Sequence, residues 1–425
     1  MAVLGVGLTG LLTAAATAGL FANLVQDCRW PRLVAVLGAL FAAGDVLSGR
    51  TTFALGLTAG LATVTLRGRR RPAVIAAVVT ALLSPVAAAL VGLVAAVLVI
   101  HRRPNGWHIG IAAAVPVIIL ALLFPSGGVE PYTFQDAWPL VVIALAVAWL
   151  TALPMIRTGA LLYAFVGLVL PVVANPVGAN VLRLALLFAA PLLLATSKRP
   201  LWLLLVVSLP ILRWQVDPVL LDLSASAPPD YAAVTQELVD LHSVRTEVVA
   251  ARDHGEASSM VSSFSLARGW VRQVDESQNQ LFYAGRLTPE SYVAWLQRNG
   301  VDHVALPLHV SYDFGSAGEA TLLGGAPIKG LDPVWTNGSW IVFAVRSPTP
   351  VVQAPARLTK ADRTALVMES PRAAQVDVIV RWSPWLSVSG PGCVVQHGDL
   401  TAVRFSGPGV VTLSSSLRPV GHCHT

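Results

Sequence analysis

Residues 73–100, AVIAAVVTALLSPVAAALVGLVAAVLVI, continue for 28 positions without a charged side chain. A hydrocarbon core about 30 Å thick requires roughly 20 apolar residues for each helix that crosses it. Similar runs recur throughout residues 1–212, which carry only four acidic side chains. We therefore predict a polytopic α-helical membrane bundle over residues 1–213.

Charge divides the chain into two parts. Residues 1–213 contain 14 Lys and Arg against 4 Asp and Glu, whereas residues 214–425 contain 15 against 19. The basic excess belongs to loops that flank apolar segments, so we expect no nucleic-acid partner, which would require a basic soluble face. Heavy use of Arg, Ala, Val and Gly with only three Lys is typical of a GC-rich bacterial genome. We expect a bacterial plasma-membrane protein.

Apolar runs and the basic residues between them predict the topology. The runs cover residues 2–25, 33–47, 52–66, 73–100, 107–124, 137–153, 159–174, 181–197 and 201–212. Basic residues concentrate at 29–32, 67–71, 102–103, 157 and 198–199, and the positive-inside rule makes these loops cytoplasmic. The last run then crosses from the cytoplasm and places residues 213–425 outside. The same alternation places the loops at 48–50, 125–136 and 175–180 outside.

The run 73–100 has basic loops at both ends, so it must enter the bilayer and return. Ser84-Pro85 near its middle is the natural point of reversal, because proline ends or kinks a helix. With this hairpin, which is short enough to be re-entrant, the bundle has about 9–10 segments. The same topology places Met1 outside, and we expect an upstream helix and loop to precede it.

The polar half reads as two extracytoplasmic domains. A linker over 217–229 is followed by alternating helical and β-rich patterns, which predict an α/β domain over residues 214–347. Its last two strands form a hairpin around Asn337-Gly338, the dipeptide that a type I′ turn prefers. Short β-branched runs between residues 364 and 413 predict a small β-sandwich over 348–425. Cys393 and Cys423 would pair there in an oxidising compartment.

Two motifs have simpler explanations than a functional site. The segment GVGLTG at residues 5–10 matches GxGxxG, but it lies inside an apolar helix and lacks the preceding strand of a dinucleotide site. Close approach of two membrane helices explains these glycines better. Asp253, His254 and Glu256 follow a predicted strand; we interpret them as a polar turn in preference to an acid–base pair around His254.

Four polar residues of the bundle are the candidate site residues: Asp45, Arg50, Asn180 and Arg183. Ionisable groups in membrane segments usually face a cavity or a partner, and the topology places all four near the outer face. Asp45 and Arg50 could pair across a helix end. Alternatively, Arg50 and Arg183 line one cavity and hold a phosphate, while Asn180 contacts a polar head group. The competing expectation is that both arginines extend to the interface.

Five segments carry a resemblance to a known family. They are residues 48–56 (SGRTTFALG), 82–88 (LLSPVAA), 174–184 (ANPVGANVLRL), 265–275 (SLARGWVRQVD) and 281–296 (LFYAGRLTPESYVAWL). These segments look like an uncharacterised family of large actinobacterial polytopic membrane proteins. That family resembles GT-C-type membrane glycosyltransferases and the membrane proteins named as related to 6-pyruvoyl-tetrahydropterin synthase. The resemblance implies a cell-envelope transferase with its catalytic acid on the first outer loop, an element that would precede residue 1.

We therefore expect a GT-C-like glycosyltransferase that uses a polyprenyl-phosphate sugar, a membrane lipid, at the outer face. Arg50, Asn180 and Arg183 would bind the substrate. The catalytic residue is unknown, Asp45 being a poor substitute for the missing acid, and no metal site is assigned, although a divalent cofactor is left open. A membrane transporter or lipid translocase and a non-catalytic envelope scaffold are the alternatives.

Overall fold

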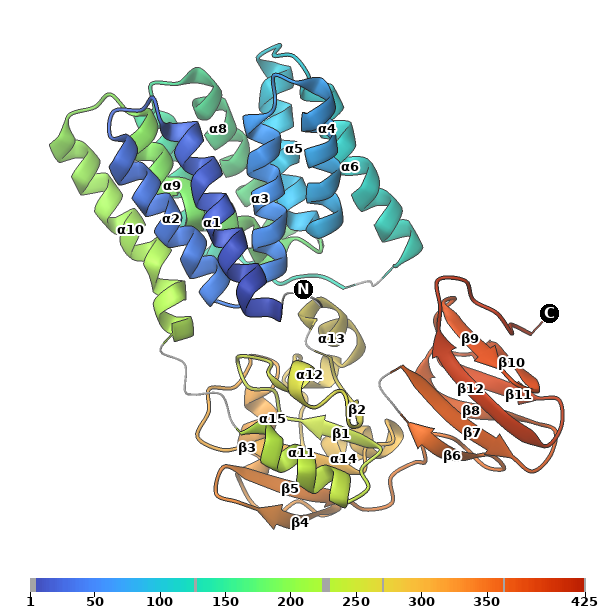
Figure 1. Ribbon diagram of the computed structural model, residues 1–425. Helices are drawn as coiled ribbons and strands as arrows, with labels where there is room; N and C mark the ends of the chain where they lie inside the picture. Colours follow the sequence, from blue (N-terminus) through green and yellow to red (C-terminus); the bar gives the residue numbers. More distant parts are fainter. Residues whose placement is uncertain (1–4, 126–127, 224–229, 270, 362–363, 424–425) are drawn as a thin grey trace. The chain divides into compact units, whose positions relative to one another are not determined.

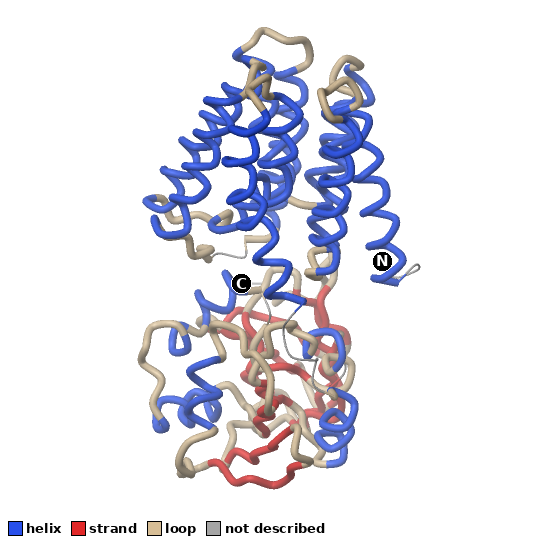
Figure 2. Tube along the Cα trace, turned by 90° about the vertical axis from the view of Figure 1, so that its left-hand side faces the viewer, coloured by secondary structure: helices blue, strands red, loops and turns tan. Residues whose placement is uncertain are grey.

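The computed structural model describes residues 5–125, 128–223, 230–269, 271–361 and 364–423. They belong to two compact units, residues 1–224 and residues 225–425. The first unit is built from helices, and every described strand belongs to the second (Figures 1 and 2). The division falls within the linker that the sequence predicts. Met1 and residues 224–229 lie outside the described part of the chain.

Ten α-helices make up the described part of the first unit, in agreement with the predicted apolar runs. They are α1 (Gly5–Val25), α2 (Pro31–Leu47), α3 (Thr51–Thr65), α4 (Arg70–Leu83), α5 (Pro85–Ile100), α6 (Gly106–Leu123), α7 (Phe134–Leu150), α8 (Pro154–Val169), α9 (Arg183–Thr196) and α10 (Leu201–Leu223), with the short 3-10 helices η1 (Leu170–Val172) and η2 (Gly178–Leu182) between α8 and α9. Only α10 passes well beyond its predicted end at residue 213. The charges that suggested a linker, Arg213 and Asp217, pair one helical turn apart on α10.

Large apolar side chains cover the outside of this unit as well as its interior. Trp107, Leu122, Phe165 and Trp202 are 71%, 76%, 64% and 66% exposed. Five described helical segments are long and apolar enough to cross a membrane: Gly5–Val25, Gly106–Leu123, Pro154–Val172, Gly178–Thr196 and Leu201–Leu223. Three shorter helices are also apolar: Thr51–Thr65, Pro85–Ile100 and Phe134–Leu150. Helices that are apolar all round are stable in lipid or inside a large core, so this surface is compatible with a multi-pass membrane protein.

The five predicted basic loops lie at one end of the helical unit. Hydrogen bonds join these loops, or the helix ends beside them, in a continuous series. The bonds connect Arg67 with Asn105, His101 with Thr158, Arg157 with Ala148, Thr151 with Thr196, and Arg29 with Arg199. The grouping of the loops by charge is therefore confirmed.

The predicted reversal at Ser84-Pro85 is also confirmed. Helix α4 ends at Leu83 and α5 begins at Pro85, with Ser84 as its N-cap. The Ser84 hydroxyl accepts a hydrogen bond from the backbone N–H of Ala87 at 3.2 Å. Since α4 starts and α5 ends beside the Arg67–Asn105 hydrogen bond, the two helices run in opposite directions.

Close helix packing accounts for part of the GxGxxG motif. The motif lies on α1, which follows no described strand. A Cβ atom at Gly10 would come within 2.6 Å of Val46 of α2, whereas one at Gly5 or Gly7 would meet nothing within 4 Å. The close-approach interpretation is therefore confirmed for Gly10 alone.

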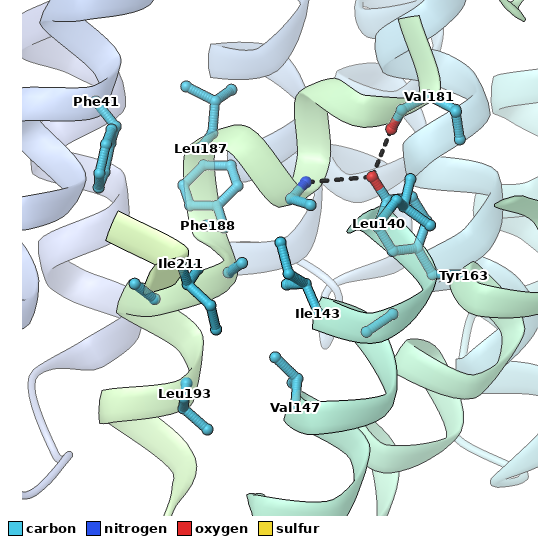
Figure 3. Close-up of a cluster of buried hydrophobic side chains, with 14 of the residues drawn as sticks. Phe41, Leu140, Ile143, Val147, Tyr163, Val181, Leu187, Phe188, Leu193 and Ile211 are labelled. Carbon is cyan, nitrogen blue, oxygen red and sulfur yellow. Dashed lines mark hydrogen bonds between the residues drawn. The ribbon is translucent and has the colours of Figure 1, made fainter. Parts of the chain in front are cut away.

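Larger apolar side chains of α7, α9 and α10, including Ile143 and Ile211, form a packed core (Figure 3).

An α/β domain begins the described part of the second unit. It consists of the helices α11 (Tyr231–Asp240), α12 (Glu256–Ser259), α13 (Arg272–Gln278), α14 (Pro289–Arg298) and α15 (Ala317–Leu323) and the strands β1 (Arg245–Val248), β2 (Ser265–Leu266), β3 (His303–Pro307), β4 (Leu331–Thr336) and β5 (Trp340–Val345). The sheet order is β2-β1-β3-β5-β4, with β1, β2 and β3 parallel and β5 antiparallel to both neighbours.

The predicted helices and strands of this domain are present, but one turn differs. The hairpin joins β4 to β5 as expected. A type I′ turn requires positive φ at both central residues, and here only Gly338 has it, at 82°. The Asn337 side chain instead accepts hydrogen bonds from the backbone N–H groups of Ser339 and Trp340, which stabilises a different turn.

Two antiparallel sheets follow. Their strands are β6 (Arg357–Ala361), β7 (Ala365–Ser370), β8 (Ala374–Arg381), β9 (Leu386–Ser389), β10 (Gly392–His397), β11 (Leu400–Phe405) and β12 (Gly409–Ser415), in the orders β10-β11-β8 and β6-β7-β12-β9. Val403 of the first sheet and Val411 of the second belong to one core, as a sandwich requires. The predicted disulfide between Cys393 and Cys423 is present.

Candidate functional site

A polar pocket lies in the first unit between α2, α9 and α10. Its empty volume is about 320 Å³, including the solvent at its mouth. Charged and amide side chains form one part of its lining and apolar side chains the other: Asp45, Arg50, Arg183 and Gln215, then Phe41, Leu186, Leu187, Pro218 and Val219. The pocket therefore combines a polar head with an apolar wall.

The turn between α2 and α3 brings Asp45 and Arg50 together. Gly49 has a φ of 76°, which a glycine adopts without strain, and the backbone N–H of Arg50 donates to the Asp45 carbonyl at 3.2 Å. The Arg50 guanidinium lies 3.8 Å from the Asp45 carboxylate and 3.5 Å from the Asp222 carboxylate near the end of α10. Arg50 is thus held between two carboxylates, at distances longer than those of a tight ion pair.

Asp45 retains an unused acceptor. Its side chain is only 4% exposed, and its Oδ2 atom is buried without a hydrogen-bond partner. An unsatisfied buried polar atom costs about 1–3 kcal/mol. A ligand group that donates a hydrogen bond to this oxygen would remove that cost.

Tyr163 sets the position of Arg183. The Tyr163 hydroxyl donates to the carbonyl of Val181 and accepts from the backbone N–H of Ala185 at 3.2 Å (Figure 3). These bonds span the junction where η2 becomes α9, and Arg183 is the first residue of α9. A buried tyrosine on a neighbouring helix therefore holds the backbone on both sides of Arg183.

The Arg183 guanidinium stacks on the Phe53 ring, 4.5 Å from its centroid. In the part of the chain that the structure describes, no carboxylate lies within ion-pair distance of Arg183. Half-buried guanidinium groups are usually paired with an anion. Arg183 thus presents an unpaired cation to the pocket.

Gln215 completes the wall. Its amide nitrogen donates to the carbonyls of Ala185 and Leu186 at 2.8 and 2.9 Å, and its amide oxygen accepts from Ala190 at 3.4 Å. Both ends of this buried amide are satisfied by the backbone of α9. Gln215 consequently fixes α10 against α9 and has a structural role in the pocket.

The structure brings three of the four predicted residues together. Asp45, Arg50 and Arg183 line one pocket, so the expected juxtaposition of the two arginines is confirmed. Asn180 lies in η2 and is not among the lining residues. Asp222, which was not among the predicted residues, also contacts Arg50.

Sequence reasoning missed Gln215 and Asp222 because it ended the bundle at residue 213. Both are polar residues placed on the continuation of an apolar helical pattern, and that pattern is the signal that could have identified them. Among the described residues, no group of three or more His, Cys, Asp or Glu side chains is arranged to hold a metal ion.

The second unit contains a separate charged cluster. Asp253, His254 and Glu256 follow β1. His254 is contacted by Glu256 and by Asp313, at 3.1 and 3.5 Å. Its pKa is raised to about 9, since these two carboxylates outweigh burial, which alone would lower it. His254 is therefore charged at neutral pH with both ring nitrogens engaged, which supports the interpretation as a structured polar turn.

Comparisons with protein-family models, curated proteins and solved structures found no match, so the function is argued from the pockets themselves.

Proposed function

We propose that the chain is a multi-pass membrane protein whose first unit binds the phosphate of a polyprenyl-phosphate sugar, as a GT-C-like glycosyltransferase would. The observation that carries the proposal is the unpaired Arg183 guanidinium in a pocket with an apolar wall. A phosphate oxygen would supply the missing anion, and the apolar side chains would contact the first isoprene units.

Asp45 favours a sugar phosphate over a simple phosphate. Its buried Oδ2 atom has no hydrogen-bond donor, and an unprotonated phosphate is an acceptor that cannot provide one. A sugar hydroxyl is a donor. A ligand that carries a phosphate and a hydroxyl therefore satisfies Arg183 and Asp45 together. In the transfer step the acceptor hydroxyl would bond to C1 of the sugar and lose its proton to the Asp45 carboxylate, while the bond between C1 and the phosphate oxygen breaks and farnesyl or polyprenyl phosphate leaves.

The apolar exterior and the charge of the loops support the proposed membrane placement. The exposed aromatic and aliphatic side chains of the helices would face lipid, and the end that carries the basic loops would face the cytoplasm. The second unit would then lie outside, where its disulfide is chemically favoured.

Cysteine labelling tests this orientation. In intact cells an impermeant thiol reagent should label Gly325→Cys, whereas Gly68→Cys should react only after the membrane is opened; both glycines are exposed. The reverse pattern would show that the topology is inverted.

Ligand binding tests the site. Purified full-length protein would be titrated with farnesyl phosphate, farnesol and inorganic phosphate. We expect farnesyl phosphate to bind most tightly, and Arg183→Gln to weaken it by roughly 10- to 150-fold, since a hydrogen bond to a charged group contributes about 1.5–3 kcal/mol. Arg213→Gln is the matched control, because Arg213 is an arginine of the same unit that does not line the pocket.

The three ligands separate the sources of affinity. Equal binding of farnesol and farnesyl phosphate would rule out a phosphate site, and equal binding of inorganic phosphate would rule out a lipid ligand. Turnover is then measured with farnesyl-phosphate-linked glucose, mannose and arabinose, with water and added methyl glycosides as acceptors of the sugar. Release of farnesyl phosphate that Asp45→Asn abolishes supports the transferase. Binding without release would instead indicate a translocase or a scaffold.

A further inference from the structure

A second pocket lies in the α/β domain, at the carboxyl ends of three parallel strands. The segments that leave β1, β2 and β3 carry His254, Arg268 and Asp313 to the same edge of the sheet. The pocket has an empty volume of about 410 Å³, including the solvent at its mouth. In open α/β sheets, ligands bind at this edge.

The floor of this pocket is a buried ion cluster centred on Arg268. Its guanidinium lies 2.7 Å from Asp275 and 3.1 Å from Glu319, and Glu247 is 3.5 Å away. Phe282 covers its face, with the ring centroid 3.9 Å from the guanidinium carbon. Burial raises the pKa values of Glu247 and Glu319, because it disfavours the charged form of a carboxyl group. The Arg268 guanidinium is therefore fully engaged by side chains of the domain itself.

The wall is also neutralised internally. His254 is clamped between Glu256 and Asp313. Arg272 donates to the same Asp313 carboxylate at 2.9 Å. Two cations and two carboxylates balance along this wall. The wall therefore offers no excess charge to an ionic ligand.

One polar atom of the wall remains without a partner. Glu256 is 5% exposed, lines the pocket, and accepts from His254 through Oε1, while its buried Oε2 atom has no hydrogen-bond partner among the residues that the structure describes. Because the oxygen belongs to a carboxylate, it requires a donor. The donor must belong to a group small enough to enter the pocket.

An exposed aromatic ring stands beside this wall. Phe314 directly follows Asp313, is 71% exposed, and packs against Tyr283, with the ring centroids 6.4 Å apart. Tyr283 lines the pocket and donates to Asp275 at 2.7 Å. Phe314 does not itself line the pocket, but it packs on a residue that does. An exposed apolar ring at the side of the pocket and an unused acceptor in its wall suit a ligand whose own surface alternates apolar C–H faces with hydroxyl groups.

We propose that this pocket binds a neutral carbohydrate, with a sugar ring against Phe314 and a hydroxyl donating to Glu256 Oε2. The balanced charges of the wall disfavour a phosphate and an ammonium ion equally, and a polyhydroxyl ring satisfies the unpaired oxygen without adding charge. The proposal is independent of the function proposed for the first unit, because it uses only residues of the second.

Carbohydrate binding is measured on the full-length protein in a detergent without a sugar head group, since a glycoside detergent would compete. The probes are methyl glucoside, methyl mannoside, methyl galactoside, methyl arabinoside, maltotriose and mannotriose, titrated by saturation-transfer difference NMR. We expect at least one to bind saturably, and Phe314→Ala to weaken that binding about tenfold.

Two further variants keep the result interpretable. Glu256→Gln leaves one acceptor oxygen where the wild-type side chain has two, and that oxygen must serve either His254 or the sugar hydroxyl, so the variant should also weaken binding. Val334→Ala, at an exposed apolar side chain of β4, should leave binding unchanged. Phe314 is exposed, so its variant should fold normally. The proposal is overturned if none of the probes binds saturably, or if Phe314→Ala and Glu256→Gln bind as the unaltered protein does. Tighter binding of phosphate or methylammonium at these residues would also overturn it.

Discussion

Both pockets described here contain arginines and carboxylates, but the arginines are loosely paired or unpaired in one pocket and closely paired in the other. In the first unit the contacts of Arg50 are 3.5–3.8 Å long and Arg183 has no carboxylate partner among the described residues. In the second unit Arg268 forms a close, forked pair with Asp275, at 2.7–3.3 Å. Unpaired charge attracts an ionic ligand, whereas a guanidinium that is already paired supports a fold and leaves room for neutral ligands. The number of charges in a pocket therefore says less than their pairing.

The largest effect on stability should come from removing the Arg268 guanidinium from its cluster of carboxylates. Arg268→Gln leaves Glu247, Asp275 and Glu319 without their shared cation, and removing one partner from a buried ion network costs about 3–5 kcal/mol. Urea unfolding followed by the near-ultraviolet signal of the second unit measures this loss. Arg346→Gln is the control, because Arg346 is 65% exposed in its pair with Asp332. A loss no greater than the control's would show that the network is not stabilising.

Reduction of the disulfide should distinguish the two units. Cys393 and Cys423 close a loop with a sequence separation of 30, and a cross-link of that span stabilises by about 3–4 kcal/mol through the unfolded state. We expect Cys423→Ser to lower the urea midpoint of the second unit only. Cys28→Ser, at the free cysteine of the first unit, is the control. A shift confined to the first unit would contradict this expectation.

The contacts of His254 with Glu256 and Asp313 predict that the free energy of unfolding depends on pH. The folded pKa of about 9 exceeds the unfolded value of about 6.5, so the stabilisation is fully present below pH 6.5 and is lost as the pH rises through 9. The effect should be on the order of 2–3 kcal/mol. Unfolding free energies measured between pH 6 and 10 should decline in the unaltered protein.

His254→Asn isolates this contribution. Asparagine tolerates the positive φ of 50° at this position, so the backbone should be retained. The variant has no imidazole to titrate and should show a flatter profile between pH 6.5 and 9. An equally steep decline would assign the pH dependence to other groups.

The smallest effect should come from Tyr163→Phe. The hydroxyl makes two backbone bonds around Arg183, and their loss should cost about 1–3 kcal/mol in stability. A loosened Arg183 should bind farnesyl phosphate a few-fold less tightly, whereas carbohydrate binding in the second unit should not change. Tyr312→Phe is a matched control, since that hydroxyl also donates to a backbone carbonyl, but in the second unit. Equal effects of both variants on farnesyl phosphate would remove the positioning role.

Much of the fold follows from the sequence because its signals are local. The hairpin at Ser84-Pro85 could be predicted from one proline and two flanking basic loops, and the helix at 289–298 from its Thr288 cap. The end of α10 could not, because Arg213 and Asp217 look like loop charges until they pair on a helix. β9 escaped prediction because a four-residue strand has too short a pattern.

The candidate site was predictable only in part. The free-energy cost of ionisable groups in membrane segments singled out Asp45, Arg50 and Arg183. The predicted topology placed all three near the outer face of the bundle, and they do line one pocket. Asp222 was missed although it is close to Arg50 in space, since 172 positions separate the two in the chain. The pocket of the second unit depends on segments that follow three different strands, and no local pattern connects them.

The sequence by itself determined which segments are apolar helices, where they reverse, and which loops carry the basic charge. Hydropathy and loop charge act on each segment separately, so they can be read in one dimension. Only the tertiary structure decided that, among the described residues, Arg268 has carboxylate partners and Arg183 has none, and that one oxygen of Glu256 is left unused there. The reason is physical: hydrogen bonds and ion pairs form over about 3–4 Å, and the fold alone sets which distant residues come that close.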